Sequence, residues 1–216
     1  MTPADFSGCR LYGILDLGYV EIGAARDMAE ALVAGGVDLL QIRGKNQSPA
    51  EIVNLARDLH AMTAARGVPL VINDHPEVAR TVGAEAVHVG QDDLGVAEAR
   101  SIAGPGCAVG KSTHTLEQAI AAFREGADYI GFGPLFATPT KPDYVPVGLA
   151  DIKKVQEAVG IPVFCIGGIK LDNLAEVIEA GARRVVIVSG FLQAPDPADY
   201  AHSAKELLNQ NSNIKK

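Results

Sequence analysis

The chain has 216 residues, which is enough for one sizeable hydrophobic core, and α/β barrels of about 200–250 residues are commonly single domains. Hydrophobic residues make up 48% and charged residues 21%, which excludes a disordered or fibrous chain. The formal net charge is −7, and no Lys/Arg-rich block precedes the final "NIKK". A nucleic-acid partner is therefore disfavoured, because phosphate backbones bind to basic surfaces.

Cysteine usage and hydropathy predict where the protein resides. Cys9, Cys107 and Cys165 are odd in number and show no CxxC spacing, which is typical of small buried thiols in a reducing compartment. The start, "MTPADFSGCR", has no apolar stretch of the signal-peptide kind. No apolar run reaches the roughly 18 residues that a membrane span needs. We therefore expect a cytoplasmic protein with no membrane association.

Eight short apolar runs alternate with segments of helical periodicity. The predicted strands are residues 11–15, 39–43, 70–73, 86–90, 107–112, 128–133, 163–168 and 184–189. The segments between them carry apolar residues at i, i+3 and i+4, as in 50–67 and 171–182. Strict alternation predicts parallel strands, and eight units without a GxGxxG fingerprint favour a single-domain (β/α)₈ TIM barrel over residues 1–216 rather than an open sheet. We expect the extreme termini, about residues 1–9 and 211–216, to be flexible.

Active sites of such barrels lie on the loops that follow the strands, so the strand ends hold the candidate residues. In "LLQIRGK", alternation predicts that Gln41, Arg43 and Lys45 share one side and Ile42 the other. Solvated charges at a strand end are common. A Gln-Arg-Lys ladder that points into a confined barrel mouth is costly, however, unless an anion binds there. The pattern favours an anion site.

Carboxylates follow the next two strands. "LVINDHP" places Asn73 and Asp74 at a strand end, and "AVHVGQDD" does the same for Asp92 and Asp93. Asp74 alone could cap the helix that starts at Pro76, and Asn73 could make a local turn. Carboxylates that converge from neighbouring strands suit Mg²⁺ better, since Mg²⁺ typically takes one or two carboxylates plus water and substrate phosphate.

The fifth and sixth units offer hydroxyls and one lysine. In "VGKSTHT", Ser112 or Thr113 could be a helix N-cap, and alternation predicts that Lys111 points away from Ser112. His114 could act as an acid or base, although an exposed histidine is more common. The sixth strand leads into "GPLFATPTKPDYVPVGL", a long loop whose four prolines restrict the backbone and whose polar groups are Thr138, Thr140 and Lys141.

The seventh and eighth units end in "CIGGIK" and "VIVSG", where small residues leave backbone N–H groups open. Loops after strands seven and eight are the usual phosphate site of barrels. Two adjacent glycines, Gly167 and Gly168, together with Ser189 favour that reading over packing relief alone. A metal-bound pyrophosphate site and a separate phosphate site suggest a transferase.

The ordered set of motifs resembles the thiamine phosphate synthase family over nearly the whole chain. The matching motifs are "QIRGK", "VIND", "HVGQDD", "GKSTHT", "GPLFATPTKP", "CIGGI" and "VVIVS". The resemblance implies a (β/α)₈ barrel that joins hydroxymethylpyrimidine pyrophosphate to a thiazole phosphate and releases pyrophosphate. It implies dissociative chemistry, in which pyrophosphate leaves first and the thiazole nitrogen captures a pyrimidine methyl cation.

The resemblance also implies residue roles. Pyrimidine-pyrophosphate contacts are Gln41, Arg43, Lys45, Asn73, Ser112 and Lys141, of which Arg43, Lys45, Ser112 and Lys141 are the candidate catalytic residues. The Mg²⁺ ligands are Asp74 and Asp93, since the GQxD spacing selects Asp93 over Asp92. Thr138, Pro139 and Thr140 line the thiazole side, and Gly168, Val188 and Ser189 hold the thiazole phosphate.

Some positions depart from the family pattern. Lys111 stands where a small or apolar residue is common, Gly44 replaces a bulkier residue, Asp16 stands in a segment that lacks a frequent threonine, and His75 stands where arginine is common. Two alternatives stay open: a metal-free thiazole tautomerase with a histidine after strand five, and a catalytically silent barrel that binds a phosphorylated ligand. The intact Asp74/Asp93 pair argues against both. The sequence leaves the oligomeric state open, a homo-oligomer included.

Overall fold

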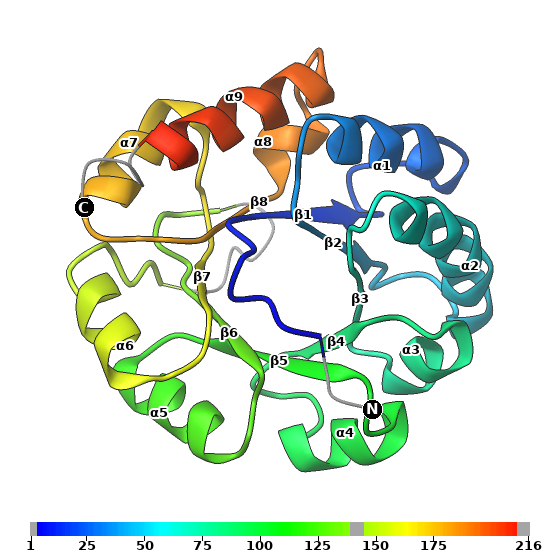
Figure 1. Ribbon diagram of the computed structural model, residues 1–216, viewed down its shortest axis with the longest axis horizontal. Helices are drawn as coiled ribbons and strands as arrows, with labels where there is room; N and C mark the ends of the chain where they lie inside the picture. The colour runs from blue at the N-terminus through cyan, green and yellow to red at the C-terminus, as the bar shows by residue number, and fades with distance from the viewer. Residues whose placement is uncertain (1–3, 139–144, 211–216) are drawn as a thin grey trace.

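A computed structural model describes residues 4–138 and 145–210 and contains a closed barrel of parallel strands ringed by helices (Figure 1). The strands are β1 (Leu11–Asp16), β2 (Leu39–Arg43), β3 (Leu70–Asn73), β4 (Ala86–Val89), β5 (Ala108–Thr113), β6 (Tyr129–Phe132), β7 (Val163–Cys165) and β8 (Val185–Ile187). Each pairs with its sequence neighbour, and β8 pairs with β1 at Leu11↔Val185, which closes the barrel. The predicted fold class is confirmed.

The helices lie outside the barrel and alternate with the strands. They are α1 (Ala25–Ala34), α2 (Pro49–Ala65), α3 (Pro76–Val82), α4 (Val96–Ala103), α5 (Leu116–Arg124), α6 (Ile152–Ala158), α7 (Leu171–Glu179), α8 (Ser189–Leu192) and α9 (Pro197–Gln210), with a 3₁₀ turn η1 (Ile22–Ala24) before α1. The start of α2 shows the local cause, because Ser48 and Glu51 form a reciprocal capping box around Pro49 at the first turn.

Two capping alternatives from the sequence are wrong. The N-cap of α5 is Thr115, whose hydroxyl accepts from Gln118 N at 3.2 Å, whereas Ser112 and Thr113 belong to β5. The N-cap position of α3 is His75, and no side chain caps that helix, so Asp74 is not a capping residue. The side chains of Ser112 and Asp74 are therefore available for other roles.

The core has two layers. The outer layer packs the helices on the outward faces of the strands and includes Ile42, as alternation predicts. The inner layer fills the barrel with Tyr12, Tyr129 and Phe164, whose rings meet edge to face. Gly110 makes room for them, because a Cβ there would lie 2.1 Å from Tyr129 Cζ.

The segment before β1 closes the N-terminal end of the barrel. Figure 1 shows this segment crossing the barrel before it enters β1. Phe6 is 1% exposed and meets the Tyr129 ring edge to face at 5.3 Å between centroids. Although the sequence predicts flexibility across about residues 1–9, Phe6 has fixed packing partners. Residues 1–3 and 211–216 lie outside the described residues.

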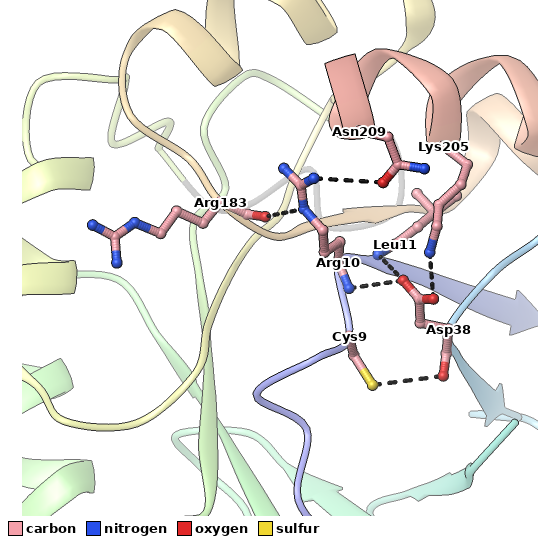
Figure 2. Close-up of polar contacts among 7 residues, drawn as sticks. All are labelled: Cys9, Arg10, Leu11, Asp38, Arg183, Lys205 and Asn209. Carbon is pink, nitrogen blue, oxygen red and sulfur yellow. Dashed lines mark hydrogen bonds and ion pairs between the residues drawn. The ribbon is translucent and has the colours of Figure 1, made fainter. Parts of the chain in front are cut away.

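Asp38 connects three segments at the same end of the barrel (Figure 2). Its Oδ2 accepts from the backbone N–H groups of Arg10 at 2.8 Å and Leu11 at 2.9 Å, and its Oδ1 pairs with Lys205 of α9. The start of β1, the end of the α1–β2 loop and the last helix are thereby tied together. These contacts stabilise the N-terminal end of the barrel, and active sites of such barrels lie at the opposite, C-terminal end.

Candidate active site

A pocket opens at the C-terminal end of the barrel, where eight of the candidate residues meet. They are Gln41, Arg43, Asn73, Ser112, Thr138, Gly168, Val188 and Ser189. They come from β2, β3, β5 and the segments after β6, β7 and β8, so barrel closure unites groups that are far apart in sequence. Pro139, Thr140 and Lys141 lie outside the described residues.

At the β2–β3 side, Lys45 and the two candidate metal ligands form a charged cluster. Lys45 Nζ pairs with Asp74 Oδ2, and the side chains of Asp74 and Asp93 interact with each other. Burial raises the pKa of Asp74 and the neighbouring Asp93 adds to the rise, against the opposing effect of Lys45. The two carboxyl groups therefore lie close enough for each to shift the pKa of the other.

Asp93 responds in the opposite direction. Burial alone would raise its pKa, but hydrogen bonds with Asp74 and the Gly90 N–H, together with the charges of Lys45 and Lys111, lower it. The Gly90 N–H lies 2.8 Å from Asp93 Oδ2. The pKa values of the two carboxyl groups are therefore shifted in opposite directions, and a bound cation would favour the ionised form of both.

Asp74 also carries an unusual backbone conformation. Its φ is 62°, which makes it the one non-glycine with positive φ among the described residues. Such a conformation costs roughly 1–3 kcal/mol and is concentrated at functional sites. The Asp74 N–H donates to the His88 carbonyl oxygen at 2.8 Å, which fixes the turn and directs the side chain toward Lys45.

The cluster fits Mg²⁺ only when a substrate completes it. Within the described residues, no group of three or more His, Cys, Asp or Glu side chains could hold a metal ion. Two converging carboxylates are nevertheless the donor set that Mg²⁺ takes when phosphate oxygens and water supply the other ligands. Burial and the neighbouring Asp93 raise the pKa of Asp74, and a cation bound between the two carboxylates would oppose that effect.

Asp16 is a pocket residue to which the sequence reasoning assigned no role. Its side chain is 4% exposed, and its Oδ2 lies 2.5 Å from Arg43 Nη1 while its Oδ1 accepts from Gly18 N at 2.9 Å. The carboxylate thus holds one edge of the Arg43 guanidinium, which carries five N–H donors in a fixed plane. The one signal in the sequence was that Asp16 stands in a segment that lacks a threonine frequent in the family.

A polar chain under the pocket connects two candidate residues. Gln41 Nε2 donates to Tyr12 OH at 2.5 Å, and Tyr12 OH lies 3.3 Å from Tyr129 OH. His88 joins Tyr129 OH at 3.2 Å to Ser112 Oγ at 2.9 Å. Burial raises the pKa of both phenols, so the two tyrosines stay uncharged, and the chain of hydrogen bonds fixes the Gln41 and Ser112 side chains.

His88 was also missed, although alternation in "AVHVG" puts its side chain inward with that of Ala86. His114 lines the same pocket, and its Nδ1 pairs with the Gly133 carbonyl oxygen. Lys111 does not line it, as its position one residue before Ser112 predicts.

The loop after β6 is fastened at both ends. Val147 N donates to Pro134 O at 2.8 Å, and Gly148 N donates to Leu135 O at 3.2 Å. Phe136 N donates to Gly167 O at 3.0 Å, which joins the loop to the glycine turn after β7. Thr138 and Gly168 both line the pocket, close to this junction.

Residues 11–191 match the family model of thiamine monophosphate synthase. The chain belongs to this family. It is 45% identical over 191 residues to the thiamine-phosphate synthase of Shouchella clausii, covering 87% of this chain and 90% of that one. The enzyme of the same name from Chloroflexus aurantiacus is 40% identical over 209 residues, 96% of each chain. Other family members therefore align along nearly the full chain.

A solved structure of the family agrees. The thiamine phosphate pyrophosphorylase of Pyrococcus furiosus superposes with a TM-score of 0.84 at 32% identity, covering 94% of this chain and 96% of that chain. The resemblance drawn from the motifs is thus confirmed as family membership. Across the described residues, every helix is too short or too polar to cross a bilayer.

Proposed function

We propose that the protein is a thiamine-phosphate synthase, which transfers the hydroxymethylpyrimidine group from its pyrophosphate to a thiazole phosphate. The observation that supports this most directly is a pocket with two kinds of anion-binding group. Arg43 and the Gly167–Gly168 turn with Ser189 line this pocket, and Lys45, Asp74 and Asp93 cluster next to Asn73, another lining residue. One anion is proposed to bind on the side of Arg43 and this charged cluster, and a second on the side of the glycine turn.

The first side suits a leaving pyrophosphate. As the C–O bond breaks, its electron pair goes to the pyrophosphate, so charge grows there toward the transition state. Arg43, held by Asp16, presents its remaining N–H donors, and Lys45 adds a mobile cation. Lys141 of the same motif set, outside the described residues, is proposed as a third cation, and Ser112 as a hydrogen-bond donor.

Asp74 and Asp93 are proposed to hold Mg²⁺ together with pyrophosphate oxygens. When bound, the ion neutralises charge on the leaving group. Lys45 now occupies Asp74 Oδ2, so we expect the lysine to exchange this carboxylate for the pyrophosphate when the substrate binds. Asn73 and Gln41 are proposed to contact the pyrimidine part, since the Tyr12 bond fixes the Gln41 amide.

The second side suits the thiazole phosphate. Gly167 and Gly168 have φ of 99° and 67°, a turn that leaves backbone N–H groups at the pocket surface near Val188 and Ser189. Thr138, Pro139 and Thr140 are proposed to line the ring. The thiazole nitrogen then forms the new C–N bond with the pyrimidine methyl cation. Few nucleophiles and a confined pocket protect that cation from water.

The free thiols Cys107 and Cys165 are buried, which supports a cytoplasmic location under reducing conditions. Burial raises the pKa of Cys107 to about 11, so this thiol is unreactive at neutral pH.

The test is formation of thiamine phosphate and pyrophosphate from the two substrates, with Mg²⁺ and with EDTA, in the wild type and His114→Ala. We expect turnover with Mg²⁺ and none in EDTA, and a His114→Ala protein that still depends on the metal. A tautomerase would work in EDTA and lose activity in His114→Ala. A silent barrel would bind the ligands and release no product at any Mg²⁺ concentration.

A further inference from the structure

Lys111 is a buried cation outside the pocket. Its residue is 6% exposed, and it lies on β5 opposite Val89 of β4. Val109, on the same side of β5, belongs to the outer core between barrel and helices. An ammonium group in such a layer is costly unless it is hydrogen-bonded and compensated by a nearby negative charge. The identity of its partners therefore matters.

Its acceptors are the two ends of the loop that follows β4. Lys111 Nζ donates to the Gly90 carbonyl oxygen at 2.7 Å and to the Leu94 carbonyl oxygen at 3.3 Å. Within this loop, residues 90–95, the Gly90 N–H donates to Asp93 Oδ2 at 2.8 Å. Both backbone groups of Gly90 are thus hydrogen-bonded: its carbonyl oxygen accepts from Lys111, and its N–H donates to Asp93.

The charge of Lys111 also acts on the loop. Its ammonium attracts the Asp93 carboxylate, whose Oδ2 accepts from the Gly90 N–H. Asp93, a candidate metal ligand, thus belongs to the loop that Lys111 holds through two carbonyl groups. An apolar side chain at this position would fill the layer without making either connection.

We infer that Lys111 is a positioning residue. By hydrogen-bonding the carbonyl oxygens of Gly90 and Leu94, it holds the β4–α4 loop in the shape that directs Asp93 toward Asp74. This inference rests on the proposed function, because it assigns Lys111 to the proposed Mg²⁺ site. Residues that orient metal ligands commonly change metal affinity by about 10–100-fold when mutated. Lys111→Met keeps the apolar stem and removes the ammonium, leaving the Gly90 and Leu94 carbonyls without their donor.

The experiment measures binding of inorganic pyrophosphate by calorimetry with and without Mg²⁺, and binding of thiazole phosphate as an internal reference. In the wild type, Mg²⁺ should strengthen pyrophosphate binding, and by linkage the converse holds. In Lys111→Met, we expect this Mg²⁺ enhancement to fall about tenfold, with thiazole phosphate affinity unchanged within about twofold. Lys111→Arg should restore much of the enhancement, because a guanidinium can also reach two carbonyls.

The matched control is Lys154→Met. It removes an exposed lysine that pairs with Asp151, and neither residue belongs to the proposed site. It should leave both affinities unchanged. If Lys111→Met does not fold, Lys111→Gln takes its place, since the amide keeps one donor and removes the charge.

The outcomes separate the inference from the function. A wild type without Mg²⁺ enhancement would overturn the metal site and this inference together. A wild type with enhancement that survives in Lys111→Met or Lys111→Gln would overturn the inference and leave the proposed function standing. Equal losses of pyrophosphate and thiazole phosphate affinity would also overturn it, because they would indicate a general structural role.

Discussion

The two ends of the barrel carry carboxylates in opposite electrostatic situations. At the N-terminal end, Asp38 accepts two backbone N–H groups and pairs with Lys205, so its charge is satisfied by the chain itself (Figure 2). At the C-terminal end, Asp74 faces Asp93, and burial together with this neighbour raises its pKa. The first arrangement stabilises the fold. In the second, Lys45 compensates the two carboxyl groups only in part, which favours a role in binding.

Asp74→Asn tests the comparison most strongly. The amide keeps the shape and removes a charge that the proposed Mg²⁺ site needs, so we expect kcat/KM for thiamine phosphate formation to fall by roughly a hundredfold or more. Stability should be unchanged or slightly higher, because the repulsion from Asp93 is relieved. Steady-state kinetics and thermal unfolding measure the two effects. Full activity in this variant would refute the assignment of Asp74.

Asp38→Asn should show the reverse pattern. The substitution removes the negative charge that accepts from two backbone N–H groups and pairs with Lys205. We therefore expect the free energy of unfolding to fall by roughly 1–3 kcal/mol. The folded protein should keep its kcat/KM, since the pocket lies at the other end of the barrel. Urea unfolding and the same kinetic assay check this pair of outcomes. A stable variant with impaired turnover would invert the comparison.

Asp16→Asn sharpens the comparison within the pocket. The amide can still accept from Gly18 but no longer neutralises Arg43. We expect pyrophosphate affinity to drop by about tenfold, because the guanidinium loses the group that orients it. Calorimetry with inorganic pyrophosphate measures this loss, and thiazole phosphate binding serves as the reference that should not change. Unaltered pyrophosphate binding would show that Arg43 needs no such support.

The smallest expected effect is the pH dependence of stability. Since the folded-state pKa of Asp74 is raised above its ordinary value of 3.8, the folded protein holds the proton more tightly, and this residue costs stability as the pH rises above about 4. Asp93 has a lowered pKa and acts in the opposite direction: its contribution is present above 3.8 and is lost as pH falls through its folded-state pKa. The two effects partly cancel.

We therefore expect Asp74→Asn to gain stability relative to the wild type as the pH rises from about 4 to about 6, by less than about 1 kcal/mol. Denaturant unfolding at both pH values, without metal or pyrophosphate, measures the difference. A relative gain that shrinks with rising pH would show that the pKa of Asp74 is lowered and would contradict the contrast drawn between the two ends of the barrel.

The sequence by itself determined the barrel and part of the pocket lining. Strict alternation of apolar runs and amphipathic segments is local information, and chain order then brings every strand end to one face. Gln41, Arg43 and Ser112 could be assigned to that face because a period of two predicts the side of each strand residue. Family motifs supplied the roles, and the proposals for Lys45, Asp74 and Asp93 rest on both kinds of information.

Only the tertiary structure decided which groups are partners. Asp16 and Arg43 are 27 residues apart, His88 and Ser112 are 24 apart, and Lys111 and Gly90 are 21 apart, each pair on neighbouring strands or the loops beside them. Phe6 fills the barrel from a segment with no secondary structure. Periodicity predicts the side on which a residue points, but a hydrogen bond depends on register, side-chain length and the shape of the adjoining loop. Those are fixed only when the barrel closes.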